Sequence, residues 1–252
     1  MSLLVALRKE LLELSRTYRL LAVVALLVVW GLISPLLAKL TPEMMRLIPG
    51  GEAFLALIPP PTIADAVAQY VKNQSQFGVI AALILAMGAV VGEKERGAAA
   101  LILSKPLSRG AFLAAKALAL ALAFGAGLAL GGAGAYYYTA LLFGAPSLGG
   151  WLALNGLMWL FFAVYIALAL LGSVVARSQA MAGALAFGAL IVVGGLGSVP
   201  RLGEWMPSKL LAWGSSLALH QGGAAWPALA ASLALIAAAL LAAWAIFRRQ
   251  EL

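Results

Sequence analysis

The residues that could support hydrolysis are few and lie in one short segment. Ser215 and Ser216 precede His220, and a serine hydroxyl near a histidine is the start of a nucleophile and base pair. An intramembrane serine protease, however, would have its histidine on another span. One histidine and no cysteine exclude a histidine cluster for a metal, a thiolate metal site and a disulfide framework. We therefore expect no catalytic residue and no metal or cofactor site in this chain.

Neither of two common energy sources for transport is encoded in the sequence. The phosphate-binding loop Gly-x4-Gly-Lys-Ser/Thr requires a Gly-Lys pair, which does not occur anywhere in the chain. Proton- and ion-coupled carriers need ionisable groups at membrane depth, and the apolar stretches carry such groups only near their ends. Active transport would therefore require a second polypeptide that binds ATP.

The densest charged segment follows the second apolar stretch of the chain. Glu93 and Glu95 complement the dipole at the start of a short helix, and residues 98–103 favour helix strongly. Pro106 ends this helix, and Ser108 is suited to cap the next one. The segment predicts a rigid cytoplasmic helix that is connected directly to two transmembrane helices. A force applied to this helix would therefore tilt both of them.

This segment resembles the loop of type 2 ABC transporter permeases, particularly the branch with the copper-enzyme maturation permease of nitrous-oxide reductase systems. The resemblance rests on Gly-Glu-x-Glu-x-Gly, then Leu-Ser-x-Pro-Leu-Ser-Arg-Gly and the later Lys116, and covers residues 59–116. It extends more weakly to residues 176–179 and to the N-terminus. In the family, this loop is the coupling helix that seats in a groove of the ATPase subunit. The resemblance implies docking roles for Glu93, Glu95, Arg96, Gly97, Leu101, Pro106, Ser108 and Arg109 in the coupling loop 93–111.

The resemblance also implies partners and a function. The chain would be the permease subunit of an ATP-driven exporter that pairs with an identical or homologous permease chain. It would recruit two cytoplasmic ATPase subunits, which would bind ATP and Mg. A different class of function is a membrane scaffold or mechanical transducer, in which ATPase-driven motion acts on an external partner. The apolar, uncharged interior fits a lipid, a hydrophobic drug, a peptide or a polysaccharide as the substrate.

The composition identifies the kind of protein that must position this loop. Hydrophobic residues make up 64% of the chain, charged residues 10%, and the mean hydropathy is +1.02. An ordinary soluble domain is about half apolar and a quarter charged, so these values indicate an integral membrane protein in contact with lipid. The net charge of +8 does not indicate nucleic-acid binding, because the basic residues flank apolar stretches instead of gathering on a solvated face.

The apolar stretches predict an all-α fold with six transmembrane helices in a single permease domain. About 20 residues cover the hydrocarbon core of a bilayer. The predicted spans are residues 20–38, 77–92, 112–136, 151–175, 181–199 and 227–247. The apolar residues 209–219 are too few to cross, and we expect a re-entrant or interfacial helix there, within an external segment 200–226.

The basic residues predict the orientation of the spans. Six spans put both ends of the chain on the same side of the cell membrane. Most Lys and Arg residues fall on that side, so we expect it to face the cytoplasm. Within residues 1–19, apolar residues recur at helical spacing: Leu4, Leu7, Leu11, Leu14 and Tyr18. We expect an amphipathic helix that lies on the cytoplasmic leaflet and is not removed as a signal peptide.

Two further features concern the loops and the packing. Residues 39–76 carry Thr41-Pro42, other Pro and Gly clusters, and a Thr62 suited to cap a short helix to Gln69, so we expect a long external loop there. Gly127 and Gly131 are one helical turn apart, a spacing that lets helix backbones approach closely. We expect this pair to serve packing inside one subunit.

Overall fold

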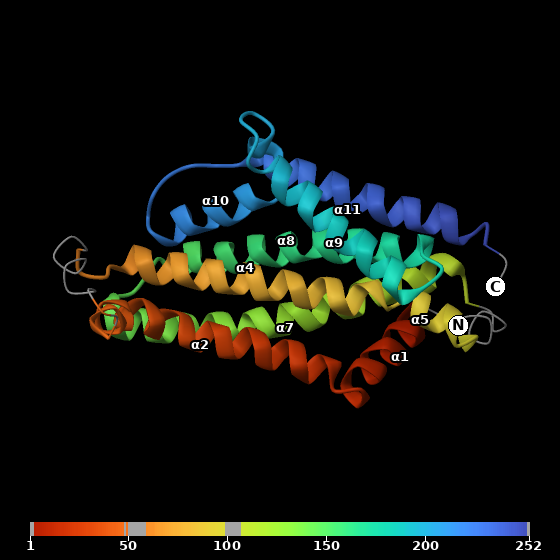
Figure 1. Ribbon diagram of the computed structural model, residues 1–252, viewed down its shortest axis with the longest axis horizontal. Coiled ribbons are helices and arrows are strands. Elements are labelled where there is room, and N and C mark those ends of the chain that lie inside the picture. Colours follow the sequence, from red (N-terminus) through yellow and green to blue (C-terminus); the bar gives the residue numbers. More distant parts are fainter. Residues whose placement is uncertain (1–2, 48, 50–58, 99–106, 251–252) are drawn as a thin grey trace.

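The computed structural model describes residues 3–47, 49, 59–98 and 107–250, and these residues form helices without strands. The elements in chain order are α1 (Leu3–Arg16), α2 (Arg19–Arg46), α4 (Ile63–Met87), α5 (Val91–Glu95), α7 (Arg109–Phe143), α8 (Leu148–Val175), α9 (Gln179–Leu196), the 3-10 turn η1 (Gly203–Trp205), α10 (Ser208–Ala218) and α11 (Trp226–Phe247). The long helices lie side by side, and α1, α5 and the end of α11 are at one end of the bundle (Figure 1).

Six of these helices are long and apolar enough to cross a membrane, which confirms the predicted all-α fold with six spans. They are α2, α4 with its continuation into α5, α7, α8, α9 and α11. Serine side chains begin three of them, since Ser108, Ser147 and Ser178 each accept a hydrogen bond from a backbone N–H in the first turn of the following helix. The predicted cap at Ser108 is therefore confirmed.

The prediction of a long loop over residues 39–76 is wrong in extent. Helix α2 continues through Pro35 and Pro42 to Arg46, and α4 begins at Ile63 directly after its N-cap residue Thr62. Thr62 is the predicted cap, but the helix that it starts does not stop at Gln69. A proline removes one backbone donor, and packing against neighbouring membrane helices tolerates that loss. Helices α2 and α4 therefore cover most of the residues predicted as a loop, and residues 48 and 50–58 of that segment lie outside the described residues.

The crossing of α2 and α7 is a very close helix contact. Gly31 of α2 lies so near the backbone of Gly131 that a Cβ atom at either position would overlap backbone atoms of the other helix. One turn away, a Cβ on Gly127 would lie 2.7 Å from Cδ1 of Leu27. The Gly127 and Gly131 pair therefore packs inside the subunit, as predicted.

Polar side chains connect α2, α4 and α8 in the half of the bundle away from α5. The Tyr70 hydroxyl donates to Oδ1 of Asn155 over 2.6 Å, and Nδ2 of Asn73 donates to Oγ of Ser34 over 3.0 Å. Nε2 of Gln74 donates to the carbonyl oxygen of Leu27 over 2.8 Å. Three of these residues come from the segment predicted as a loop. They are inside the bundle because each of these side chains forms a hydrogen bond with another helix.

Replacing Tyr70 with phenylalanine should lower stability modestly. The change removes a buried hydrogen bond but keeps the ring, so we expect a loss of about 1 kcal/mol and a fall of roughly 2–4 °C in the melting midpoint. Tryptophan fluorescence in detergent would follow the transition. Tyr137→Phe is the control, because Tyr137 is exposed. Equal midpoints for Tyr70→Phe and wild type would show that the Tyr70–Asn155 bond does not contribute.

The short helices α1 and α10 pack against the spans. Leu210, Gly214 and Ala218 of α10 are buried, and α10 lies along α8 (Figure 1). Its 11 residues span about 16 Å, which is too short to cross a bilayer.

Helix α1 differs from the prediction in the face that it buries. Its buried residues are Ala6, Glu10 and Leu14, and Leu7 and Leu11 also pack against the core, chiefly beside α7. Two members of the predicted apolar face are exposed: Leu4 at 74% and Tyr18 at 73%. The other three, which were also predicted to face lipid, pack against the rest of the protein, where Glu10 finds charged partners.

Candidate functional site

Helix α5 begins at a break in the second span, and a serine from another span stabilises that break. Helix α4 ends at Met87, and α5 starts at Val91 after three intervening residues. Oγ of Ser173, on α8, accepts hydrogen bonds from the backbone N–H groups of Val90 (3.1 Å) and Val91 (3.0 Å). Helix N-termini leave N–H groups without backbone partners, and Ser173 satisfies two of them. The start of α5 is therefore attached to α8.

Lys94 attaches α5 to the end of α8. Its ammonium nitrogen donates to the carbonyl oxygens of Val174 over 2.8 Å and Ala176 over 3.0 Å. Nε2 of Gln250, which follows α11, donates to the same Val174 oxygen over 3.0 Å. A cation at a helix C-terminus also interacts favourably with the helix dipole. The ends of α5, α8 and α11 are thus bonded to one another.

Glu95 and Arg109 attach two more helix ends. Oε1 of Glu95 accepts a hydrogen bond from the backbone N–H of Gln179, the first residue of α9, over 3.2 Å. Nη1 of Arg109, the first residue of α7, donates to the carbonyl oxygens of Phe247 (2.5 Å) and Gln250 (2.6 Å) at the end of α11. A carboxylate at a helix N-terminus and a guanidinium at a C-terminus are both favourable electrostatically.

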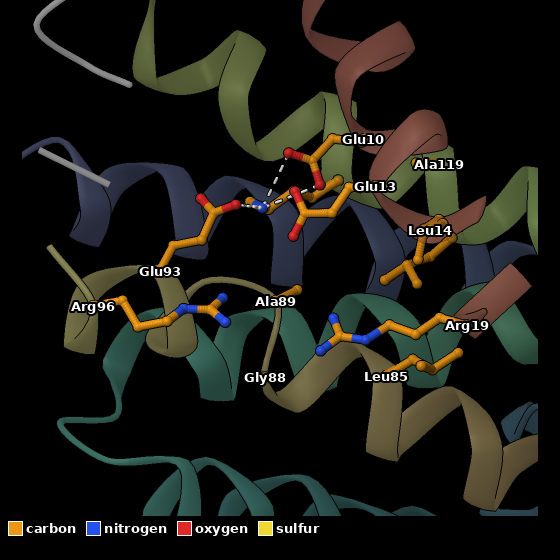
Figure 2. Close-up of a pocket in the computed structure, with 12 residues that line it drawn as sticks. Glu10, Glu13, Leu14, Arg19, Leu85, Gly88, Ala89, Glu93, Arg96 and Ala119 are labelled. Atoms are coloured by element: carbon orange, nitrogen blue, oxygen red, sulfur yellow. Dashed lines mark hydrogen bonds and ion pairs between the residues drawn. The ribbon is translucent and has the colours of Figure 1, made fainter. Parts of the chain in front are cut away.

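Glu93 lies at the centre of a buried ion-pair cluster. Its Oε1 is 2.8 Å from Nζ of Lys116 on α7 and 2.9 Å from Nζ of Lys9 on α1. Glu10 pairs with the same two lysines, at 3.1 Å from Lys116 and 2.9 Å from Lys9. Glu93 and Lys116 are each only 3% exposed. Figure 2 shows the carboxylates of Glu10 and Glu93 bonded to one ammonium group between them.

We call α5 and the groups bonded to it the α5 junction: Val90–Glu95, with Lys9, Lys116, Ser173, Val174, Ala176 and Gln179. These bonds connect α5 to α1, α7, α8 and α9. A displacement of α5 would therefore act on at least four helices through direct hydrogen bonds and ion pairs.

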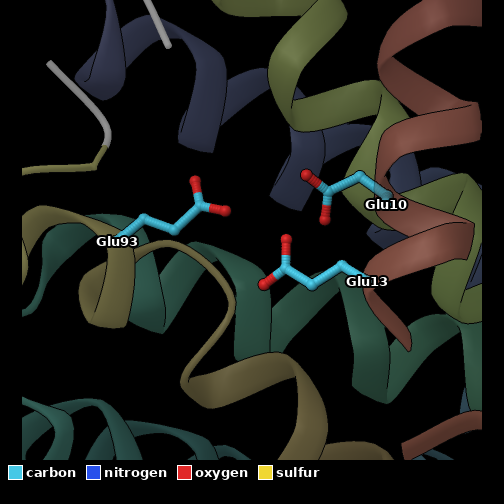
Figure 3. A group of neighbouring side chains, drawn as sticks. All are labelled: Glu10, Glu13 and Glu93. Carbon is cyan, nitrogen blue, oxygen red and sulfur yellow. The ribbon is translucent and has the colours of Figure 1, made fainter. Parts of the chain in front are cut away.

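Three carboxylates of the ion-pair cluster lie close enough to hold a metal ion. One oxygen each of Glu10, Glu13 and Glu93 lies within 4.8 Å of the others, and their side chains converge (Figure 3). Lys9 is bonded to all three, at 2.9, 2.8 and 2.9 Å. Ammonium groups thus compensate these carboxylates, so the geometry is that of an ion-pair cluster rather than of a metal centre.

The protonation of two α1 residues follows from this cluster. Burial opposes the charge on Lys9, but the hydrogen bonds that Lys9 donates to Glu13, Glu10 and Glu93 outweigh it and raise its pKa above the ordinary value. Burial would also raise the pKa of Glu13, but its hydrogen bond to Lys9, with the nearby positive charges, holds that pKa below the ordinary value. Both groups are therefore charged across the neutral range.

Docking of α1 should depend on pH in a defined direction. A lowered Glu13 pKa stabilises the folded state above the unfolded pKa of 4.5, and this contribution is lost as pH falls through the folded value. A raised Lys9 pKa stabilises below pH 10.5, and its contribution is lost as pH rises through the folded value. We expect slow hydrogen exchange in α1 between about pH 5 and about pH 10, and faster intrinsic-rate-corrected exchange in more acidic buffer. Unchanged protection in acid would contradict this expectation.

Comparison with known proteins identifies the family. A sequence profile of the ABC-2 family transporter protein matches residues 4–200. The chain belongs to the ABC-2 transporter family. It is also 28% identical over 253 residues to YxlG of Bacillus subtilis (strain 168), an uncharacterized transmembrane protein, and the match covers 97% of this chain and 96% of YxlG. The resemblance to type 2 ABC permeases is thereby confirmed, and the copper-maturation branch stays a prediction.

The ABC-2 protein places the predicted docking residues in three different settings. Glu95, Arg96, Gly97 and Ser108 are exposed, and Gly97 has a positive φ of 67° that suits glycine. Leu101 and Pro106 lie outside the described residues. Glu93, Glu95 and Arg109 also bond to other helices of the same chain, and the docking roles of all these residues stay a prediction.

Several residues of the α5 junction were not predicted from the sequence. Lys9, Lys94 and Ser173 received no role, and Glu10 was not recognised as a buried group. One signal was available for the ion-pair cluster: Lys116 lies in the first turns of a span that is otherwise apolar, and a buried lysine requires a carboxylate partner. The partners could not be chosen from the sequence, because Glu10 is 106 positions away.

Proposed function

We propose that this ABC-2 protein is the permease subunit of an ATP-driven exporter, energised by separate ATPase subunits that dock on the coupling loop 93–111. The observation that carries the proposal is the α5 junction. The loop begins within α5, and α5 is bonded directly to α1, α7, α8 and α9. A force applied by a docked partner would therefore reach several spans at once.

The proposed complex contains two ATPase subunits and a second permease chain, identical or homologous. The ATPase subunits bind ATP and Mg, in agreement with a family whose membrane subunit typically has no ATPase of its own. Room for a second permease chain exists along α9, whose buried residues are limited to Ala182 and Ala186. Closure of the ATPase pair on ATP would move both coupling loops and open a path between the two permease chains.

The orientation follows from the charges at the junction end. Arg96, Arg109, Arg177, Arg248 and Arg249 all lie near α5 or the cytoplasmic ends of the neighbouring spans in the proposed topology. Positive charge accumulates on the cytoplasmic side of membrane helices. We therefore infer a multi-pass protein of the cell membrane with both termini in the cytoplasm, where the ATPase subunits would have access to the loop.

Co-purification tests the docking site. The tagged chain would be isolated from mild detergent as wild type and as Leu101→Arg, which introduces a charge and bulk into the coupling loop. We expect a bound ATPase with wild type and at least about tenfold less with the variant, because interface cores exclude unpaired charges.

The matched control is Leu202→Arg, since Leu202 is an exposed leucine in the external segment 200–226. This variant should retain the ATPase. Equal loss from both leucine variants would show that the effect is not specific to the loop. Recovery of no ATPase with wild type in several detergents would favour the scaffold or transducer function instead.

A further inference from the structure

A pocket beside the α5 junction lies where the cytoplasmic surface meets the membrane in the proposed orientation. It is a small pocket of about 30 Å³, open to the outside, between α1, the start of α2, the α4–α5 break and α7. Leu14, Leu85 and Leu120 form an apolar part of its wall, and charged side chains form the rest. The pocket is thus amphipathic.

Two arginines point into this pocket from opposite sides. Arg19 is the first residue of the first span, and Arg96 directly follows α5. Their guanidinium groups face each other across the pocket, above Gly88 and Ala89 (Figure 2). A Cβ atom on Gly88 would meet no atom within 4 Å, so the space beside it is open. Two like charges converging on one open space favour an anion there.

The carboxylates of the pocket do not neutralise these two arginines. In the described part of the chain, neither Arg19 nor Arg96 forms an ion pair, although the charge of Arg19 contributes to the lowered pKa of Glu13. Glu10, Glu13 and Glu93 are bonded to Lys9 and Lys116 instead. Three carboxylates thus face two ammonium and two guanidinium groups, and the excess positive charge is on the arginines.

We propose that Arg19 and Arg96 form a binding site for a phosphate group, supplied by an anionic phospholipid of the cytoplasmic leaflet. Guanidinium groups bind phosphate oxygens in a bidentate manner, and basic pockets between membrane helices accept lipid headgroups. The pocket is small, so only the phosphate oxygens would enter it, and the glycerol and acyl chains of the lipid would lie outside it in the bilayer, an anchorage that a free phosphate ion does not possess. A bound phosphate would connect the first span to the end of α5, beside the coupling loop.

Thermal unfolding of the delipidated full-length chain in detergent tests this site. Dioleoyl phosphatidylglycerol should raise the melting midpoint of wild type by about 5 °C relative to dioleoyl phosphatidylcholine, because a ligand that binds only the folded state stabilises it. In Arg19→Gln/Arg96→Gln, that difference should fall by at least about half. The charge-matched control Arg177→Gln/Arg249→Gln removes two exposed arginines outside the pocket and should keep the full difference.

Two further measurements identify the source of the phosphate and exclude misfolding of the variant as the cause of a lost shift. Glycerol phosphate, a soluble headgroup, should have no effect at the same concentration; an equal shift would support the site and assign it to a soluble phosphate. Native mass spectrometry of Arg19→Lys/Arg96→Lys, which keeps both charges, should show fewer retained phosphatidylglycerol molecules than wild type. Equal lipid shifts in wild type and Arg19→Gln/Arg96→Gln, or no shift in wild type, would overturn the proposal.

Discussion

Lys116→Met should lower the stability of the protein by about 3–5 kcal/mol, the range expected when one partner of a buried ion pair is removed. Lys116 is 3% exposed and is bonded to both Glu10 and Glu93. Methionine keeps a similar length but leaves two buried carboxylates to share Lys9. We expect the melting midpoint in detergent to fall by roughly 10 °C, and α1 to become accessible to protease.

Two variants make this prediction specific to the ion-pair cluster. Lys116→Met/Glu93→Gln removes a carboxylate along with the ammonium group and should recover about half of the lost stability. Lys209→Met breaks an exposed ion pair with Glu204 and should cost less than about 1 kcal/mol. If Lys116→Met were as mild as Lys209→Met, the cluster would not stabilise the cytoplasmic end of the bundle.

Gly31→Ala should destabilise the chain by about 2–3 kcal/mol, although alanine is the better helix former. The added Cβ would overlap the backbone of Gly131, so α2 and α7 would have to separate. That separation would weaken packing along the whole crossing, including the contact of Leu27 with Gly127. The melting midpoint in detergent should fall by roughly 6–8 °C.

The matched control for Gly31→Ala has the opposite expected sign. Gly156 is also inside a membrane helix, α8, and a Cβ there would meet no atom within 4 Å. Gly156→Ala should therefore be neutral or stabilise by up to about 1 kcal/mol, which is the ordinary gain of replacing a helical glycine. A Gly31→Ala midpoint equal to that of wild type would contradict the close crossing of α2 and α7.

The number and type of elements could be predicted from the sequence because hydropathy reports directly on membrane spans. The bounds could not, where polar residues lie inside helices. Tyr70, Asn73 and Gln74 look like loop residues in a linear reading, yet each bonds to another helix. Pro42 looks like a helix stop, yet α2 continues past it. In both cases tertiary partners, which are distant in sequence, outweigh the local signal.

The location of the candidate site could be predicted from the sequence, but the roles of its individual residues could not. The acidic and basic residues after the second span correctly mark the segment that joins the helix ends. Their spacing does not reveal that Glu93 is buried while Arg96 is exposed, because α5 has only five residues and follows a break. Three of the partners belong to α1 and α8, whose positions relative to α5 depend on the assembled bundle.

The ion-pair cluster also sets an order for biosynthesis. Glu10 emerges from the ribosome 106 residues before its partner Lys116. At about 5–20 residues per second, α1 would wait roughly 5–20 seconds for the third span. During that interval the Glu10 carboxylate remains hydrated at the membrane surface, since burying it alone would be costly. Completion of the cluster would therefore have to follow the synthesis of α1, α5 and the start of α7.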